Sequence, residues 1–106
     1  MEISGNLISG NVAGSLGGGL LTYNTSSTPE KAGLRIFDNE FSGNEAEVGG
    51  GLYGFALPMD NNVVTGNVAV LGGGGVAGYV YGEGNTITGN TPDDQSSLYG
   101  EHPTYQ

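Results

Sequence analysis

The sequence contains no cysteine and no tryptophan, and only two of its 106 residues are lysine or arginine. The absence of cysteine excludes disulfide bonds, thiol catalysis and cysteine-ligated zinc. Against the two basic residues stand 11 acidic ones, which gives a net charge of −9. This charge argues against nucleic acid as a partner, because phosphate binding needs Lys and Arg. It favours divalent cations or a cationic partner.

Long apolar runs are also missing from the sequence. No stretch approaches the roughly 20 apolar residues of a membrane-spanning helix, so we expect no direct membrane insertion. Glu2 and Gly5 interrupt the first residues, which therefore do not match the apolar core of a signal peptide. If the parent protein is exported, its signal lies outside this sequence.

Glycine, by contrast, is abundant, with 22 residues, and it falls at fixed points of an internal repeat. The pattern Asn-x-x-x-Gly-Asn begins at Asn6, Asn39, Asn62 and Asn85, and the last three are spaced by 23 residues. A fixed period of this length is typical of solenoid proteins. In a solenoid each repeat buries its apolar side chains against the next one. A sequence with few hydrophobic residues can therefore still form a core.

The repeat divides the chain into four copies, and the first copy is longer than the others. The copies are 1–33, 34–56, 57–79 and 80–100, followed by a tail of residues 101–106. We expect the additional residues of the first copy to form a loop at 22–33, since solenoids tolerate insertions at their corners. The phrase Leu98-Tyr-Gly matches Leu52-Tyr-Gly, which places the end of the fourth copy at Gly100.

Apolar residues recur at fixed distances from the first Asn of each copy, and residues two apart on a strand share a face. The predicted inward columns are Met1, Leu34, Leu57 and Val80, then Ile3, Ile36, Met59 and Gly82, then Ile8, Phe41, Val64 and Ile87. A further column of Leu20, Leu52 and Leu98 indicates a third strand. The pattern predicts an all-β fold, a right-handed parallel β-helix of about four coils of 23 residues with three short strands per coil.

The Asn residues of the repeat form two further columns beside the predicted turns. Gly-Asn pairs suit corners because Gly prefers and Asn tolerates the left-handed backbone region. Stacked Asn side chains can also bond to one another along the axis. The predicted turn ladder consists of Asn6, Asn39, Asn62 and Asn85, and of Asn11, Asn44, Asn67 and Asn90.

One copy resembles a known family of repeats. Phe41-x-x-Asn44, Ala46 and Gly49-Gly-Gly-Leu52 are similar to the polymorphic outer-membrane protein repeat, written Phe-x-x-Asn plus Gly-Gly-Ala followed by an aliphatic residue. The aromatic is Ile or Val in the other copies, and Gly replaces the Ala throughout. The resemblance implies a β-helix of the autotransporter-passenger kind, exported and displayed at the cell surface, without a catalytic motif.

Carboxylates form the first candidate site. Asp60 and Glu83 occupy equivalent positions on adjacent copies, with Asp38 displaced by one position. Stacked carboxylates can bind a cation such as Ca²⁺, or act as a pair in glycoside hydrolysis. We favour a solvated acidic corner over both, and so expect no cofactor and no catalytic residues.

Tyrosines form the second candidate site. Tyr53 and Tyr99 share a repeat position, and Tyr79 and Tyr81 share a strand face that should point outward. Exposed aromatic rings can stack on sugars or anchor a protein interface. The alternative is that these rings simply cover the strands.

These observations favour a non-enzymatic, extracellular module, a segment of a bacterial adhesin or passenger that binds a host or neighbouring-cell protein or glycan. Two alternatives stay open. One is a carbohydrate-active β-helix, such as a polysaccharide lyase or glycoside hydrolase, and the other is a structural spacer. Because β-helix ends expose strand edges, we also expect end-to-end self-association through the first copy, or marginal stability alone.

Overall fold

A computed structural model of the chain describes residues 1–25 and 33–97. Strands, turns and bends make up these residues, and none of them is helical. Consequently no helix in this part of the chain is long and apolar enough to cross a membrane.

The strands form three sheets, and every strand pair is parallel. The six-stranded sheet has the order β1 (Glu2–Ser4), β4 (Arg35–Phe37), β7 (Leu52–Asp60), β10 (Val76–Tyr81) and β12 (Gln95–Ser96), and β3 (Leu20–Leu21) also pairs with β7. The four-stranded sheet has the order β11 (Thr86–Thr88), β8 (Val63–Thr65), β5 (Glu40–Ser42) and β2 (Leu7–Ser9). The two-stranded sheet pairs β6 (Glu45–Val48) with β9 (Val68–Gly72).

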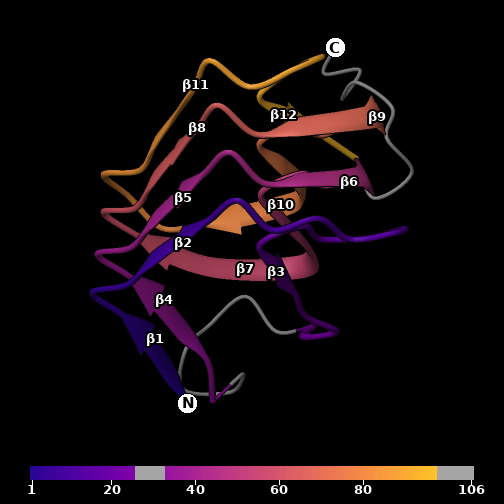
Figure 1. The fold of residues 1–106 in the computed structure, drawn as a ribbon. Helices are drawn as coiled ribbons and strands as arrows, with labels where there is room; N and C mark the ends of the chain where they lie inside the picture. The colour runs from indigo at the N-terminus through magenta and orange to yellow at the C-terminus, as the bar shows by residue number, and fades with distance from the viewer. Residues whose placement is uncertain (26–32, 98–106) are drawn as a thin grey trace, which may run out of the picture.

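The sequence repeat determines which strands pair. Ile8 lies opposite Phe41, Phe41 opposite Val64, and Val64 opposite Ile87, as the spacing predicts. Figure 1 shows the result, with β2, β5, β8 and β11 stacked one above another from the first copy to the fourth. An all-β fold with parallel sheets is therefore established for the described residues.

The core runs through the middle of this stack. Its fully buried members come from the second and third copies and from the start of β10: Ile36, Phe41, Leu52, Leu57, Met59, Val64 and Val76. Ile3, Ile8, Val80 and Ile87, from the first and fourth copies, are only partly buried against them. The prediction that Met1 points inward is wrong, because its side chain is 81% exposed.

The predicted column of Leu20, Leu52 and Leu98 also needs a correction. Leu20 does pair with Leu52, but Leu52 pairs with Val76, and Val76 pairs with Gln95. Gln95 therefore takes the position that the Leu-Tyr-Gly match assigned to Leu98, which lies outside the described residues. The match failed because Gln95 follows Asn90 by only five positions, whereas Val76 follows Asn67 by nine.

Two bulges lie between the second and third copies and compensate each other. In β9 the register shifts so that Val48 pairs with Gly72, one residue more than the period. In β7 and β10 it shifts back, leaving Phe55 unpaired between Gly54 and Ala56. The extra residue of a bulge is left unpaired in the ladder. At these two places Phe55 is 48% exposed, and Val70 and Leu71 are 74% and 56% exposed.

The predicted loop of the first copy begins as an extension of β3. The Thr22 amide donates to Tyr53 O, and Asn24 O accepts the Ala56 amide, so this segment continues along β7. Of the expected loop at 22–33, residues 26–32 lie outside the described residues, as does the tail of residues 101–106.

Glycine is required at two kinds of position in the repeat. Gly43 and its equivalents Gly10, Gly66 and Gly89 have φ angles between 64° and 69°, the left-handed conformation predicted for the Gly-Asn corners. Gly50 needs its small size instead, because a Cβ there would meet the carbonyl oxygens of Val68 and Gly74. The glycine triplets thus let neighbouring copies approach closely.

Candidate functional site

The Asn columns form two continuous hydrogen-bonded ladders through the stack. Asn44 is representative: its backbone amide and its Nδ2 both donate to Asn67 Oδ1 at 2.9 Å, and Nδ2 also donates to Ile8 O at 2.9 Å. The same pattern links Asn39 to Asn62. Asn44 and Asn67 have no exposed surface. Since a buried amide needs all its partners, these ladders hold adjacent copies together and do not receive a ligand.

Both ladders have one direction. In each link the Asn nearer the N-terminus donates, and the Asn of the next copy accepts through Oδ1, from Asn6 to Asn85 and from Asn11 to Asn90. In these Asn-to-Asn links the donors therefore point toward the fourth copy and the Oδ1 acceptors toward the first. From the second copy on, Nδ2 also donates to a carbonyl of the preceding copy.

The three candidate cation ligands do not converge. Asp60 Oδ1 accepts the backbone amide of Glu83 at 3.0 Å, so this carboxylate helps to form a turn. Asp38 lies one position further along its copy, where Asn61 is its equivalent. Within the described ranges, no three His, Cys, Asp or Glu residues are grouped to hold a metal ion.

The backbone conformation explains which residue types occupy the repeat position of Asp38. Asp38 and Asn61 have φ angles of 58° and 56°, and Gly5 and Gly84 adopt the same conformation at the equivalent position. Asp, Asn and Gly are the residues that tolerate the left-handed region best. An acidic corner is also the interpretation that the sequence favoured over a cation site.

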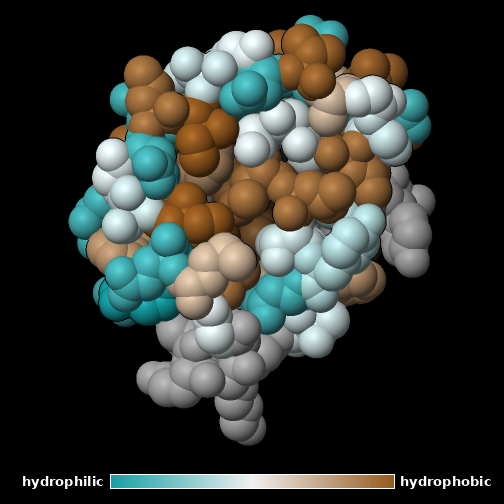
Figure 2. Space-filling model, turned by 60° about the horizontal axis from the view of Figure 1, so that its bottom comes forward, coloured by the Kyte–Doolittle hydropathy of each residue, from teal (hydrophilic) through white to brown (hydrophobic). Residues whose placement is uncertain are grey.

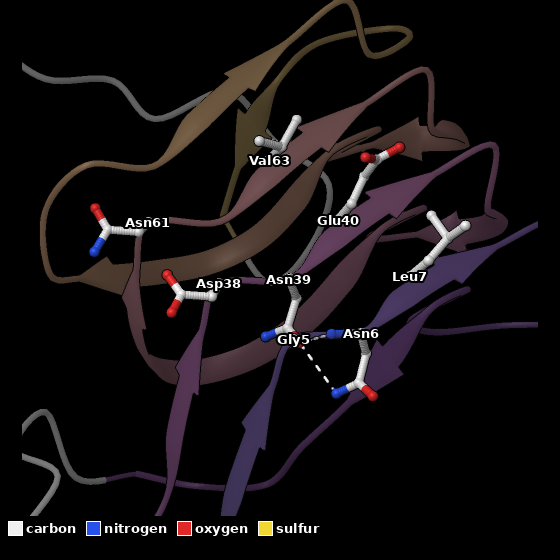
Figure 3. A pocket seen from close by; sticks show the side chains of 8 residues that line it. All are labelled: Gly5, Asn6, Leu7, Asp38, Asn39, Glu40, Asn61 and Val63. Atoms are coloured by element: carbon white, nitrogen blue, oxygen red, sulfur yellow. Dashed lines mark hydrogen bonds between the residues drawn. The ribbon is translucent and has the colours of Figure 1, made fainter.

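A groove open to solvent lies beside this corner, with a volume of about 450 Å³. Figure 3 shows its lining, which comes from the first three copies: Gly5, Asn6, Leu7, Asp38, Asn39, Glu40, Asn61 and Val63. Glu40 stands between Leu7 and Val63 in register. The groove therefore holds two carboxylates, those of Asp38 and Glu40, on its second-copy wall.

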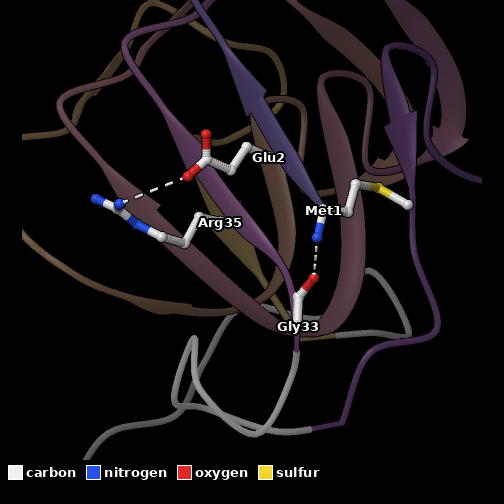
Figure 4. Close-up of polar contacts among 4 residues, drawn as sticks. All are labelled: Met1, Glu2, Gly33 and Arg35. Carbon is white, nitrogen blue, oxygen red and sulfur yellow. Dashed lines mark hydrogen bonds and ion pairs between the residues drawn. The ribbon is translucent and has the colours of Figure 1, made fainter.

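Polar contacts at the start of the chain join the β1 segment to the residues around the start of β4 (Figure 4). The Met1 amino group donates to Gly33 O at 2.5 Å, and the Arg35 guanidinium lies 4.0 Å from the Glu2 carboxylate. The same guanidinium lies over the Phe37 ring, 4.4 Å from its centre. Arg35 is the one basic side chain among the described residues, and these contacts orient it along the outer face of the six-stranded sheet.

Aromatic side chains gather on that outer face. Tyr79 and Tyr81, two residues apart on β10, are 50% and 43% exposed, and Phe55 of the neighbouring β7 is 48% exposed. The register places Tyr79 opposite Ala56 and Tyr81 opposite Pro58. Tyr53 is only half-buried on β7, and Tyr99 lies outside the described residues. Strand alternation located the two tyrosines, but Phe55 depends on a bulge that the period conceals.

Asp93 and Asp94 of the fourth copy act as hydrogen-bond acceptors for residues of the repeat. Asp94 Oδ1 accepts both the backbone amide and Nδ2 of Asn90 at 3.0 Å. Asp93 Oδ1 accepts the amides of Gly73 and Gly74, at 2.6 and 3.1 Å. The short spacing between Asn90 and Gln95 brings them there, and that spacing is the signal that could have revealed them.

Comparison of this chain with protein-family models, with curated proteins and with solved structures finds no match. The similarity to the polymorphic outer-membrane protein repeat consequently rests on the motif residues alone.

Proposed function

We propose that this chain is a right-handed parallel β-helix that serves as a non-enzymatic binding module on the surface of a bacterial adhesin or autotransporter passenger. The winding is supported by strand pairs that recur at the sequence period in three parallel sheets. The right hand follows from the rule for parallel crossover connections.

The binding surface is the aromatic surface formed by Phe55, Tyr79 and Tyr81. Its exposed rings are the observation that carries the proposal, because three large aromatic side chains at 43–50% exposure lie on adjacent strands of one rigid sheet. Tyrosine combines a flat apolar ring with a hydroxyl that bonds at its edge, which suits a sugar ring. The ligand class is therefore a glycan, held by ring stacking along β10.

A glycan array followed by titration calorimetry on the best glycan tests this proposal. We expect Tyr79→Ala and Tyr81→Ala each to weaken binding by at least about tenfold, since stacking residues at the centre of an interface carry most of its affinity. Val70→Ala is the matched control, because Val70 is 74% exposed but belongs to β9 in another sheet.

Two results would contradict the proposal. Unchanged affinity in both tyrosine variants would place the ligand elsewhere. Release of reducing ends or of unsaturated products from a bound polysaccharide would assign a carbohydrate-active enzyme in its place.

A further inference from the structure

The two ends of the stack present different surfaces. At the first-copy end, formed by β1, β2 and β3, each strand has a neighbour on one side only. Ile3, Ile8 and Leu20 are packed against the core but stay partly exposed. Figure 2 shows this end, where apolar side chains gather across its middle. This end of the described stack is therefore apolar.

The direction of the Asn ladders determines which hydrogen-bonding groups lie at this end. Asn6 and Asn11 donate to Asn39 and Asn44 of the next copy. Their own Oδ1 atoms accept no hydrogen bond from the described residues, and both side chains are exposed. The first-copy end thus offers two amide oxygens, at the positions where every later copy receives two donors.

The fourth-copy end is closed over one ladder. Asn90 donates to Asp94 Oδ1 through the same two groups, and at nearly the same distances, as Asn67 donates to Asn90 Oδ1. Asp94 therefore occupies the place of the next Asn. An ionised carboxylate accepts hydrogen bonds but donates none, so the ladder cannot continue beyond it.

We propose that the first-copy end is a docking surface for the last copy of another parallel β-helix, one that presents amide donors at both ladder positions. The apolar face, the unpaired strand edges and the two Oδ1 acceptors all match such a partner. A second copy of this chain does not, because its Asp94 carboxylate would face the Oδ1 of Asn11, acceptor against acceptor. Asp94 thereby prevents the chain from stacking on itself.

Asp94→Asn tests this inference, since it supplies the missing partner from the chain itself. The new side chain keeps the oxygen that accepts from Asn90 and adds an amide donor that points toward the next molecule. We expect the variant to form head-to-tail polymers that do not close, with a self-association constant at least about tenfold above that of the wild type. Sedimentation velocity over a concentration series measures it.

Asp93→Asn is the charge-matched control. It also changes the net charge by one, but Asp93 accepts from Gly73 and Gly74 and lies off the ladder. We expect it to stay as monomeric as the wild type. Association of Asp93→Asn equal to that of Asp94→Asn would show that net charge alone controls stacking, and would overturn the inference.

A second change shows which end is used. The Asn6 carbonyl and the Gly10 amide both bond to the second copy, and alternate residues of a strand face opposite sides, so the Ser9 amide faces the open edge. Ser9→Pro removes this donor where an edge strand tolerates proline. Added to Asp94→Asn, it should abolish the polymers.

The inference is wrong if Asp94→Asn remains monomeric, if the wild type polymerises equally, or if Ser9→Pro leaves the polymers intact. These outcomes concern assembly only, and glycan binding by the aromatic surface is unaffected by them.

Discussion

The first and second copies carry the same residue at several equivalent positions but bury it differently. Ile3 and Ile36 pair with each other in register, and yet Ile36 has no exposed surface while Ile3 is only partly buried. The two copies differ in the number of copies that pack against them. Among the described residues, the second copy has an adjacent copy on each side, and the first copy has an adjacent copy on one side only. Burial in this fold is therefore supplied by adjacent copies, as in other repeat proteins.

The ladders show the same contrast for polar groups. Asn44 and Asn67 are fully buried, whereas Asn11, the same residue in the same ladder, is exposed. A hydrogen bond of unchanged geometry is consequently expected to matter more in the middle, where water cannot replace it. Matched substitutions at equivalent positions can test this contrast directly.

The largest difference is expected in the column that contains Met1 and Leu57. Leu57 has no exposed surface and Met1 is 81% exposed, so Leu57→Asp buries an unpaired charge while Met1→Asp leaves its charge in water. Leu57→Asp should unfold the chain, and Met1→Asp should melt within a few degrees of the wild type. Far-UV circular dichroism and thermal melting measure both.

A Leu57→Asp protein with an unchanged melting temperature would mean that Leu57 does not face the core. A Met1→Asp protein that fails to fold would mean that the first copy contributes more burial than its exposure indicates.

The second difference compares Ile36→Ala with Ile3→Ala. Removing a fully buried isoleucine leaves a cavity and should lower the free energy of unfolding by about 2–5 kcal/mol. Ile3 loses less contact because its site is open on one side, so we expect less than half of that effect. Urea unfolding of both variants measures the two free energies. Equal losses of unfolding free energy would show that Ile3 and Ile36 contribute equally to the core.

Much of this fold was predictable because the period itself states which residues pair. Phe41, Val64 and Ile87 follow one another at 23 residues, and they lie opposite one another in the four-stranded sheet. The Gly-Asn pairs at the corners predicted left-handed turns, because Gly prefers and Asn tolerates that backbone conformation.

The errors arose where burial or register depends on something other than the period. Met1 has an inward position but no copy beneath it that covers it among the described residues. Gln95 and Phe55 lie where the spacing changes, through a shortened fourth copy and a bulge. Matching letters between copies cannot locate such changes, because insertions and deletions alter the register without altering the motif.

The candidate site was predictable to a similar degree. Alternation along β10 indicated that Tyr79 and Tyr81 share an outward face, and both are exposed. The role of Asp60 was not predictable, because its carboxylate accepts the backbone amide of Glu83, 23 residues further along the chain. Only the assembled turn brings that amide to the carboxylate.

The smallest of the three differences is expected within the second Asn ladder. Asn67 accepts both donors of Asn44 and itself donates to Asn90 and to the Phe41 carbonyl. Asn67→Ala removes the acceptor of both buried Asn44 donors and should cost about 1–3 kcal/mol of unfolding free energy. Asn11→Ala removes one donor, Nδ2, at the exposed end of the same ladder, and the Asn11 backbone amide still bonds to Asn44 Oδ1. Because water can replace that donor, the substitution should cost less than about 1 kcal/mol. Urea unfolding gives both values, and native-state hydrogen exchange shows whether the loss is local to the third copy. If Asn11→Ala proves as costly as Asn67→Ala, the ladder acts as one cooperative unit, and the contrast between the middle and the end of the stack applies to the apolar core alone.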